Sequence, residues 1–188
     1  MASSDSQKAS TLVANLKELS AKTHAAADDS EIWAALNQTL SQQFGYQLLT
    51  VLKYSSETGA TRLHSTNVKL HPLGHRDPVT SESDKGAAPP TPPSRPAWIK
   101  KVLVDGETWR GSTREDLKLV FEDWELLWHA GLGSVLNIPV RIHGRTIGSL
   151  NVLDKEHAYD DADLAIGILI AQLVAPTIQS AGEKKTAA

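Results

Sequence analysis

Residues 131–153, GLGSVLNIPVRIHGRTIGSLNVL, constrain the fold of this chain more than any other segment. Two apolar, strand-like runs are joined by a His-Gly pair, which predicts a β-hairpin. A two-residue loop would place Asn151 on the same face as the leucine and isoleucine of the other strand. A three-residue loop that ends in a left-handed Gly144, with a bulge, instead pairs Arg141 with Arg145.

The bulged register separates apolar from polar side chains, so we adopt it; a slip of one residue would mix them. One face of the hairpin is then wholly apolar and suited to a core, whereas the other carries two asparagines and a serine. The apolar face comprises Leu136, Ile138, Val140, Leu150 and Val152, and the other comprises Val135, Asn137, Ser149, Asn151 and Leu153.

The two asparagines of the hairpin require polar partners. Asparagine is disfavoured within strands, and a covered amide without partners costs a few kcal/mol. Asn137 and Asn151 share a face with Ser149, a pattern that suggests the partly polar floor of a ligand cavity. Hydrogen bonding to loop backbone, which would close the edge of the sheet, is the alternative interpretation.

The composition excludes several classes of function. The chain has 188 residues, a length typical of one domain, and a net charge of -3, which gives no reason to expect nucleic acid as a partner. It contains no cysteine, so disulfides, thiolate nucleophiles and cysteine-ligated metals are ruled out. No segment has the apolar core of a secretory signal or the length of a membrane span, so we expect a cytoplasmic protein without membrane contact.

Hydrophobic spacing and capping signals give an ordered set of elements. Asp28 with Glu31, and Thr113 with Asp116, have the spacing of capping boxes. The order predicts an α+β fold in which terminal helices cover one face of an antiparallel sheet and a central loop, Trp98 and the Trp124 helix cover the other. The expected elements are helices at about 11–27 and 29–44, strands at 47–54 and 61–66, a proline-rich loop at 67–96, a short helix after 98, a strand at 107–111, a helix at 114–128, the hairpin, and a helix at 162–179 kinked near Pro176.

The hairpin resembles that of the GAF domain family. The matching features are a serine-led strand ending in proline, SVLNIPV from Ser134, and a second strand with the pattern IGxL, here Ile147-Gly148-Ser149-Leu150. The helix before the hairpin and the helix after Tyr159-Asp160 extend the likeness over about 30–180. The resemblance implies an α/β/α sandwich around a central antiparallel sheet of about six strands. Family members bind small molecules or dimerise through their first and last helices.

Three departures narrow what the resemblance implies. No residues are left for an output domain, so we expect a stand-alone module. The free methionine sulfoxide reductases are similar small GAF domains that act through cysteines, so their chemistry is excluded here. The motif of cyclic-nucleotide-binding GAF domains, Asn-Lys-x-x-x-Phe-x-x-x-Asp-Glu, is absent, which weakens that class of ligand. We therefore expect a domain at 30–180, a flexible tail at 181–188, and a helix at 1–29 that is a candidate element of a homodimer.

Four tryptophans fall in the segment predicted to cover the sheet: Trp98, Trp109, Trp124 and Trp128. Indole rings can sandwich an aromatic or cationic molecule, so all four are candidate ligand-binding residues. The alternative for Trp124 and Trp128, which follow the helical stripe, is that they attach their helix to the sheet. Trp98 and Trp109 lie outside a regular stripe and are the stronger candidates.

Histidines supply the second candidate chemistry. His64 and Arg62 are predicted to share one face of a strand, where they could perform acid–base work or hold an anion. Solvent exposure of both is the plainer interpretation. His71 and His75 flank a proline, which disfavours the helical spacing of a metal site, and we predict neither metal nor cofactor.

The sequence therefore supports three hypotheses. The first is a sensor-like GAF domain that binds a small, partly apolar molecule between Asn137, Ser149, Asn151 and the tryptophan cover. The second is a cofactor-independent enzyme that uses His64 and Arg62 in the same cavity. The third is a dimerisation module whose cavity is filled by its own side chains.

Overall fold

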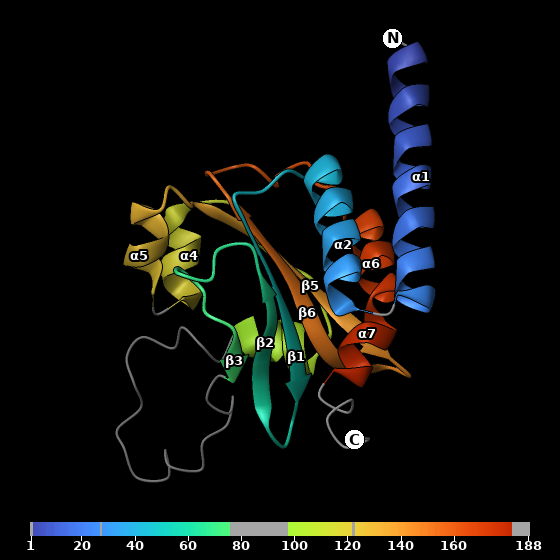
Figure 1. Cartoon of the computed structure of the whole chain (residues 1–188). Coiled ribbons are helices and arrows are strands. Elements are labelled where there is room, and N and C mark those ends of the chain that lie inside the picture. Colours follow the sequence, from blue (N-terminus) through green and yellow to red (C-terminus); the bar gives the residue numbers. More distant parts are fainter. Residues whose placement is uncertain (1, 27, 76–97, 122, 182–188) are drawn as a thin grey trace, which may run out of the picture.

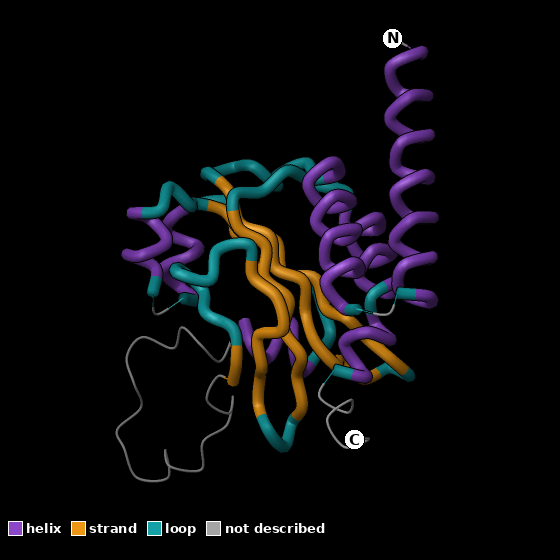
Figure 2. The backbone as a smooth tube through the Cα atoms, in the orientation of Figure 1, coloured by secondary structure: helices purple, strands orange, loops and turns teal. Residues whose placement is uncertain are grey.

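The structure is a computed structural model and describes residues 2–26, 28–75, 98–121 and 123–181. A six-stranded antiparallel sheet lies between two groups of helices (Figure 1), as the predicted α+β sandwich requires. Figure 2 shows the strands in orange with helices on either side. The strand order is β3-β2-β1-β6-β5-β4, with β1 Leu48–Ser55, β2 Gly59–Ser65, β3 Gly74–His75, β4 Trp109–Gly111, β5 Ser134–Ile142 and β6 Arg145–Asp154.

The β5–β6 hairpin sorts its faces as predicted but uses a different turn. Ile142 pairs with Arg145, and both His143 and Gly144 have positive φ, so the loop has two residues and the predicted Arg141–Arg145 pair is wrong. The bulge lies in β6, where Ile147 has no partner in β5. This extra residue restores the separation of apolar and polar faces that a two-residue loop alone would have lost.

The first face of the sheet, defined by the apolar side of β5 and β6, packs against four helices. These are α1 (Ala2–Ala25), α2 (Asp29–Gln43), α6 (Leu164–Leu173) and α7 (Ala175–Ser180). The apolar residues of this layer form a continuous buried core. It contains Leu19, Ile32, Leu36, Leu40, Leu49, Val51, Leu136, Ile138, Val140, Leu150, Val152, Tyr159, Ile170 and Ile178.

The helices of this layer begin and end close to the predicted signals, with two differences. Asp28 caps α2 and Asp163 caps α6, each accepting hydrogen bonds from backbone amides. The first helix begins at Ala2, about nine residues before the predicted start. The predicted last helix is divided at Val174, because Pro176 at the start of α7 cannot continue the hydrogen bonding of α6.

The second face of the sheet is covered by three short elements: the π-helical turn η2 (Lys100–Val104), α4 (Arg114–Val120) and α5 (Trp124–His129). The single helix predicted at 114–128 is divided, because Phe121 adopts an extended backbone. The break lets both short helices bury a leucine. Leu117 and Leu127 pack with Leu48, Leu132, Val135 and Leu153.

Within the described residues, none of the helices combines the length and apolarity that crossing a bilayer requires. The greater part of the predicted proline-rich loop, residues 76–97, lies outside the described chain, as does the tail from 182. The part of this loop that the structure describes, before residue 76, contributes the short edge strand β3, which pairs with Thr61 and Arg62 of β2.

Candidate functional site

A row of polar side chains crosses the second face of the sheet. Thr50 of β1 lies opposite Asn151 of β6, which lies opposite Asn137 of β5, which in turn lies opposite Trp109 of β4. Directly opposed residues on antiparallel strands project to the same side, so all four share this face. Thr50, Asn151 and Asn137 are buried. The structure thus brings the two predicted asparagines together.

A chain of hydrogen bonds links this row to the cover. The indole Nε1–H of Trp98 donates to Asn137 Oδ1 at 2.9 Å, and Asn137 Nδ2 donates to Asn151 Oδ1 at 2.5 Å. Asn151 Nδ2 in turn lies 3.3 Å from Thr50 Oγ1 and 3.5 Å from the Thr50 carbonyl oxygen. All of these hydrogen bonds run in one direction, from Trp98 through the two asparagines to Thr50 of β1. Among the residues that the structure describes, the asparagines bond to each other, to an indole and to Thr50 of β1, and not to loop backbone as in the alternative interpretation.

Ser149 occupies the neighbouring position on the same face. It lies opposite Leu52 of β1 and is completely buried. Its hydroxyl makes no hydrogen bond within the part of the chain that the structure describes. A covered hydroxyl without a partner costs roughly 1–3 kcal/mol, so Ser149 would gain from a hydrogen bond to a ligand atom.

Two indoles and the η2 turn pack together beside the asparagine pair. Trp98 lies two residues before η2 and meets the ring of Phe121 edge-on, with the ring centroids 6.2 Å apart. A small apolar cluster at η2 consists of Ile99, Val102 and Leu103. Trp98, Trp109 and Tyr54 pack against this cluster. The π-helical turn is a rare conformation that is frequent at functional sites.

Trp124 and Trp128 occupy a different environment. Their rings meet edge-on with centroids 4.4 Å apart, on α5 at the outer end of this layer (Figure 1). Arg114 lies over Trp128, and Lys118 lies over Trp124. Leu127, which lies between them in the sequence, makes the contact with the sheet. The structure therefore brings only Trp98 and Trp109 to the asparagine pair.

Arg62 and His64 do not share a face, so this prediction is wrong. The β1–β2 register shifts between Val51 and Leu52, leaving Leu63 without a partner; His64 therefore pairs with Val51 of the first face and Arg62 with Leu52 of the second. A bulge of this kind reverses the alternation of side chains beyond it.

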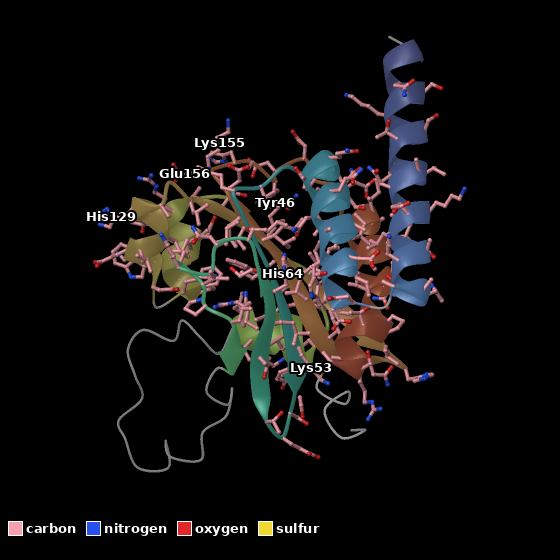
Figure 3. All side chains as sticks on the ribbon, in the orientation of Figure 1. Tyr46, Lys53, His64, His129, Lys155 and Glu156 are labelled. Atoms are coloured by element: carbon pink, nitrogen blue, oxygen red, sulfur yellow. The ribbon has the colours of Figure 1, made fainter. Side chains whose placement is uncertain are left out.

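His64 lies between β2 and α2 (Figure 3), on the far side of the sheet from the asparagines. Its ring stacks on Trp33 with centroids 5.7 Å apart, and its Nε2–H donates to Asn37 Oδ1 at 3.1 Å. Burial lowers the pKa of the His64 imidazole. These contacts are those of a partly covered, neutral histidine at a helix–sheet contact.

Arg62 and His71 lie together at the β2 end of the second face. Both are buried, and the Arg62 guanidinium donates to the carbonyl oxygen of Pro72, directly after His71. His71 Nε2 lies 3.4 Å from Asp123 Oδ2, without hydrogen-bond geometry. Arg62 and His71 are therefore neighbours on the second face, whereas His64 lies on the first.

Sequence reasoning missed Thr50 and Phe121. Thr50 stands between Leu48 and Leu52 in the alternation of β1, so it is a polar residue at a position expected to be covered. That signal could have placed it beside Asn151. Phe121 was assigned to the apolar stripe of one long helix and gave no separate signal.

A cavity of about 750 Å³ lies elsewhere, between α1, α2 and α6. Its lining is rich in amide side chains, among them Asn15, which is buried and donates a hydrogen bond to Gln42. This cavity adjoins the helices of the first face, whereas the polar row lies on the second.

A scan against protein families matches the GAF domain model over residues 32–179. The chain belongs to the GAF domain family. The match covers all six strands of the sheet and every residue of the polar row, but not α1. The resemblance inferred from the hairpin motifs is therefore confirmed.

Solved GAF domains share the fold at low sequence identity. One from an Acinetobacter phosphoenolpyruvate-protein phosphotransferase has 10% identity and a TM-score of 0.65, covering 93% of this chain and 96% of its own. A GAF domain of a two-component sensor histidine kinase from Bacillus halodurans has 19% identity and a TM-score of 0.59, covering 82% and 96%. The free methionine-R-sulfoxide reductase of Neisseria meningitidis, solved with its substrate, has 14% identity and a TM-score of 0.64, covering 94% and 93%. No curated protein matches the chain.

Proposed function

We propose that this GAF domain binds a small, partly apolar molecule, aromatic or cationic, against the second face of its sheet. Asn137, Asn151 and Ser149 form the polar floor, and Trp98 and Trp109 form the cover. The observation that supports this most directly is the buried Ser149 hydroxyl, which lies beside the amide pair and forms no hydrogen bond within the described chain.

The chemistry of the floor suits a ligand that is mostly ring or hydrocarbon with one or two polar atoms. Ligand sites in proteins typically combine apolar and aromatic walls with a few convergent polar groups. The floor residues carry amides and a hydroxyl, and the indole faces beside them can attract an aromatic ring or a positive charge. Binding of such a molecule to the folded state would make the domain a sensor of its concentration.

The acid–base alternative draws no support from this arrangement. His64 contacts α2 across the sheet from the amide pair, so His64 and Arg62 cannot act on one molecule in the same cavity. The sensor hypothesis is therefore the one that the geometry favours.

A thermal-shift screen against aromatic metabolites, amines and nucleotides tests the proposal. A ligand that binds only the folded state raises the melting temperature, by an amount that grows with its concentration. We expect Ser149→Ala, Asn151→Leu and Trp109→Ala to reduce the shift caused by any compound found, and Trp124→Ala, a matched indole removal on α5, to leave it intact. A shift that survives all three floor and cover substitutions would place the ligand elsewhere.

We also infer that two copies pair through α1 and α6. Val13 of α1 and Ile168 and Leu169 of α6 are exposed apolar side chains on the two helices that border the 750 Å³ cavity. Sedimentation equilibrium should show a dimer for the intact chain and a monomer for Leu169→Glu. Leu126→Glu on α5 is the matched control, since Leu126 is 49% and Leu169 51% exposed. A monomeric parent chain, or equal dissociation of both variants, would refute the pairing.

A further inference from the structure

The indole of Trp98 occupies the hydrogen-bond acceptor that a ligand on this face would use. Its Nε1–H lies 2.9 Å from Asn137 Oδ1, while the Asn137 amide nitrogen is committed to Asn151. Trp98 is itself only partly buried, although Asn137 is completely buried. A side chain from the cover therefore reaches down to a floor residue and places a flat ring against it.

The direction of the hydrogen bonds restricts what could take the place of the indole. An indole nitrogen only donates, so the group at Asn137 Oδ1 must be an N–H or O–H. The remaining members of the chain, Asn151 and Thr50, are already oriented to accept in the same direction. A replacement that only accepts would require both amides and the Thr50 hydroxyl to reverse their hydrogen bonds together.

The surroundings of Trp98 also select shape. Its ring meets Phe121 edge-on and packs on the cluster of Ile99, Val102 and Leu103. Edge-to-face contact is a preferred arrangement of aromatic rings, so a flat ring in this position gains contacts that an aliphatic group would not. Shape and hydrogen bonding together describe a planar heterocycle that carries one N–H.

The backbone beside Trp98 is suited to a change of position. The residue lies two positions before the π-helical turn η2, with Ile99 between them, and the hydrogen bonds of such a turn span one residue more than those of an α-helix. Such a turn is seldom adopted by five residues without a specific cause, and it places Trp98 close to the N-terminal end of an element that contacts both β5 and β6.

We propose that the Trp98 side chain fills the ligand site on the second face of the sheet when no ligand is bound. The ligand is a planar ring with an N–H group, which replaces the indole as the donor to Asn137 Oδ1. The proposal rests on the function proposed above. In the closed state the indole donates to Asn137; in the bound state the ligand donates, and the displaced indole becomes part of the cover. Binding is thereby coupled to a movement of Trp98 and η2.

Indole and 1-methylindole are suitable probes, because they differ only in the N–H. In Trp98→Ala, the indole-sized space beside Asn137 should bind indole, and 1-methylindole about fivefold more weakly, the factor that corresponds to one net hydrogen bond. Trp98→Phe keeps a ring but removes the competing donor, and it should bind indole about fivefold more tightly than the parent chain. The added substitution Asn137→Leu should abolish the preference for indole over 1-methylindole.

Isothermal titration calorimetry gives these affinities, and ¹H–¹⁵N spectra report the indole N–H of Trp98, identified by its absence from Trp98→Phe. Equal binding of the two probes, or no gain in either variant, would overturn the proposal. The function proposed above would survive that result if a ligand from the screen still lost its thermal shift in Ser149→Ala and Asn151→Leu. If no compound shifted the parent chain, the proposed function itself would fail.

Discussion

Asn137 donates a hydrogen bond of 2.5 Å to Asn151, the residue directly opposite it on the neighbouring strand. Both side chains are buried, and each makes one further contact, Asn137 with Trp98 and Asn151 with Thr50. The pair joins two strands of the hairpin to the cover above it and to β1 beside it. It is thus a structural connection as well as the floor of the proposed site.

This relationship predicts a strong coupling between the two asparagines. Asn151→Leu leaves the Asn137 amide nitrogen buried without its acceptor, and Asn137→Leu leaves the Asn151 oxygen without its donor; each should lower the free energy of unfolding by about 2 kcal/mol. Replacing both removes the partners together, so the double variant should lose less than the sum of the two by about 1 kcal/mol or more. Urea denaturation of the four proteins measures this coupling. Strictly additive losses would show that the amides do not stabilise each other.

The aromatic pair on α5 gives a second prediction. The contacts of Trp124 and Trp128 run to each other and to Lys118 and Arg114 at the surface. An exposed contact between a cation and an indole contributes about 0.5–1 kcal/mol. Lys118→Met, which keeps the length of the side chain without its charge, should therefore lower the stability by no more than about 1 kcal/mol and leave ligand binding unchanged. A loss of ligand binding in this variant would extend the site to α5.

The sequence predicted which side chains of the hairpin share a face, but it did not predict the turn of the hairpin or the bulge of β2. The predicted turn of the hairpin was wrong, but the predicted faces were right. The predicted and observed registers differ by two residues, and a shift of two leaves every side chain on the same face. Simple alternation along a strand places residues two apart on one face, and this is why Arg62 and His64 were assigned together; the bulge at Leu63 breaks that alternation, and β2 carries no sequence signal for it.

The contacts between residues of the site depend on tertiary packing, so they could not be predicted from the sequence. The apolar spacing from Leu117 to Trp128 is continuous, and nothing in it marks the extended backbone of Phe121 that ends α4. The bond from Trp98 to Asn137 joins residues 39 apart in the sequence. The two residues could be predicted as members of one site, but not as partners.

Gly148 provides a third prediction, on the fit between β6 and β1. A Cβ at this position would collide with the backbone carbonyl oxygen of Leu52 and would lie 3.0 Å from Ile178 Cγ2. Since a backbone atom cannot move aside by changing rotamer, Gly148→Ala should cost about 3 kcal/mol in the free energy of unfolding. Gly144→Ala is the control: it has open space around it but a positive φ of 78°, so strain alone should cost about 1 kcal/mol. Thermal or urea unfolding measures both losses of stability. Equal losses for Gly148→Ala and Gly144→Ala would contradict the predicted collision.

The fourth prediction concerns the pH dependence that His64 contributes. Burial lowers the pKa of His64 in the folded state, while in the unfolded chain it titrates near about 6.5. Between these two pKa values the unfolded state binds more protons than the folded state, so acidification favours unfolding. The free energy of unfolding should therefore fall as the pH drops from above 7 through 6.5, and the decline due to this group should cease once the pH lies below the folded pKa.

Replacing His64 with glutamine tests this assignment, because the new amide can still donate to Asn37 but does not titrate in this range. The His64→Gln protein should lose less stability than the parent chain between pH 7.5 and pH 5, a range that brackets the ordinary histidine pKa of about 6.5. His129→Gln, at an exposed position on α5, should retain the parent dependence. Urea denaturation across this range gives the three profiles. A His64→Gln profile parallel to that of the parent chain would mean that burial at the contact with α2 does not suppress protonation of this ring.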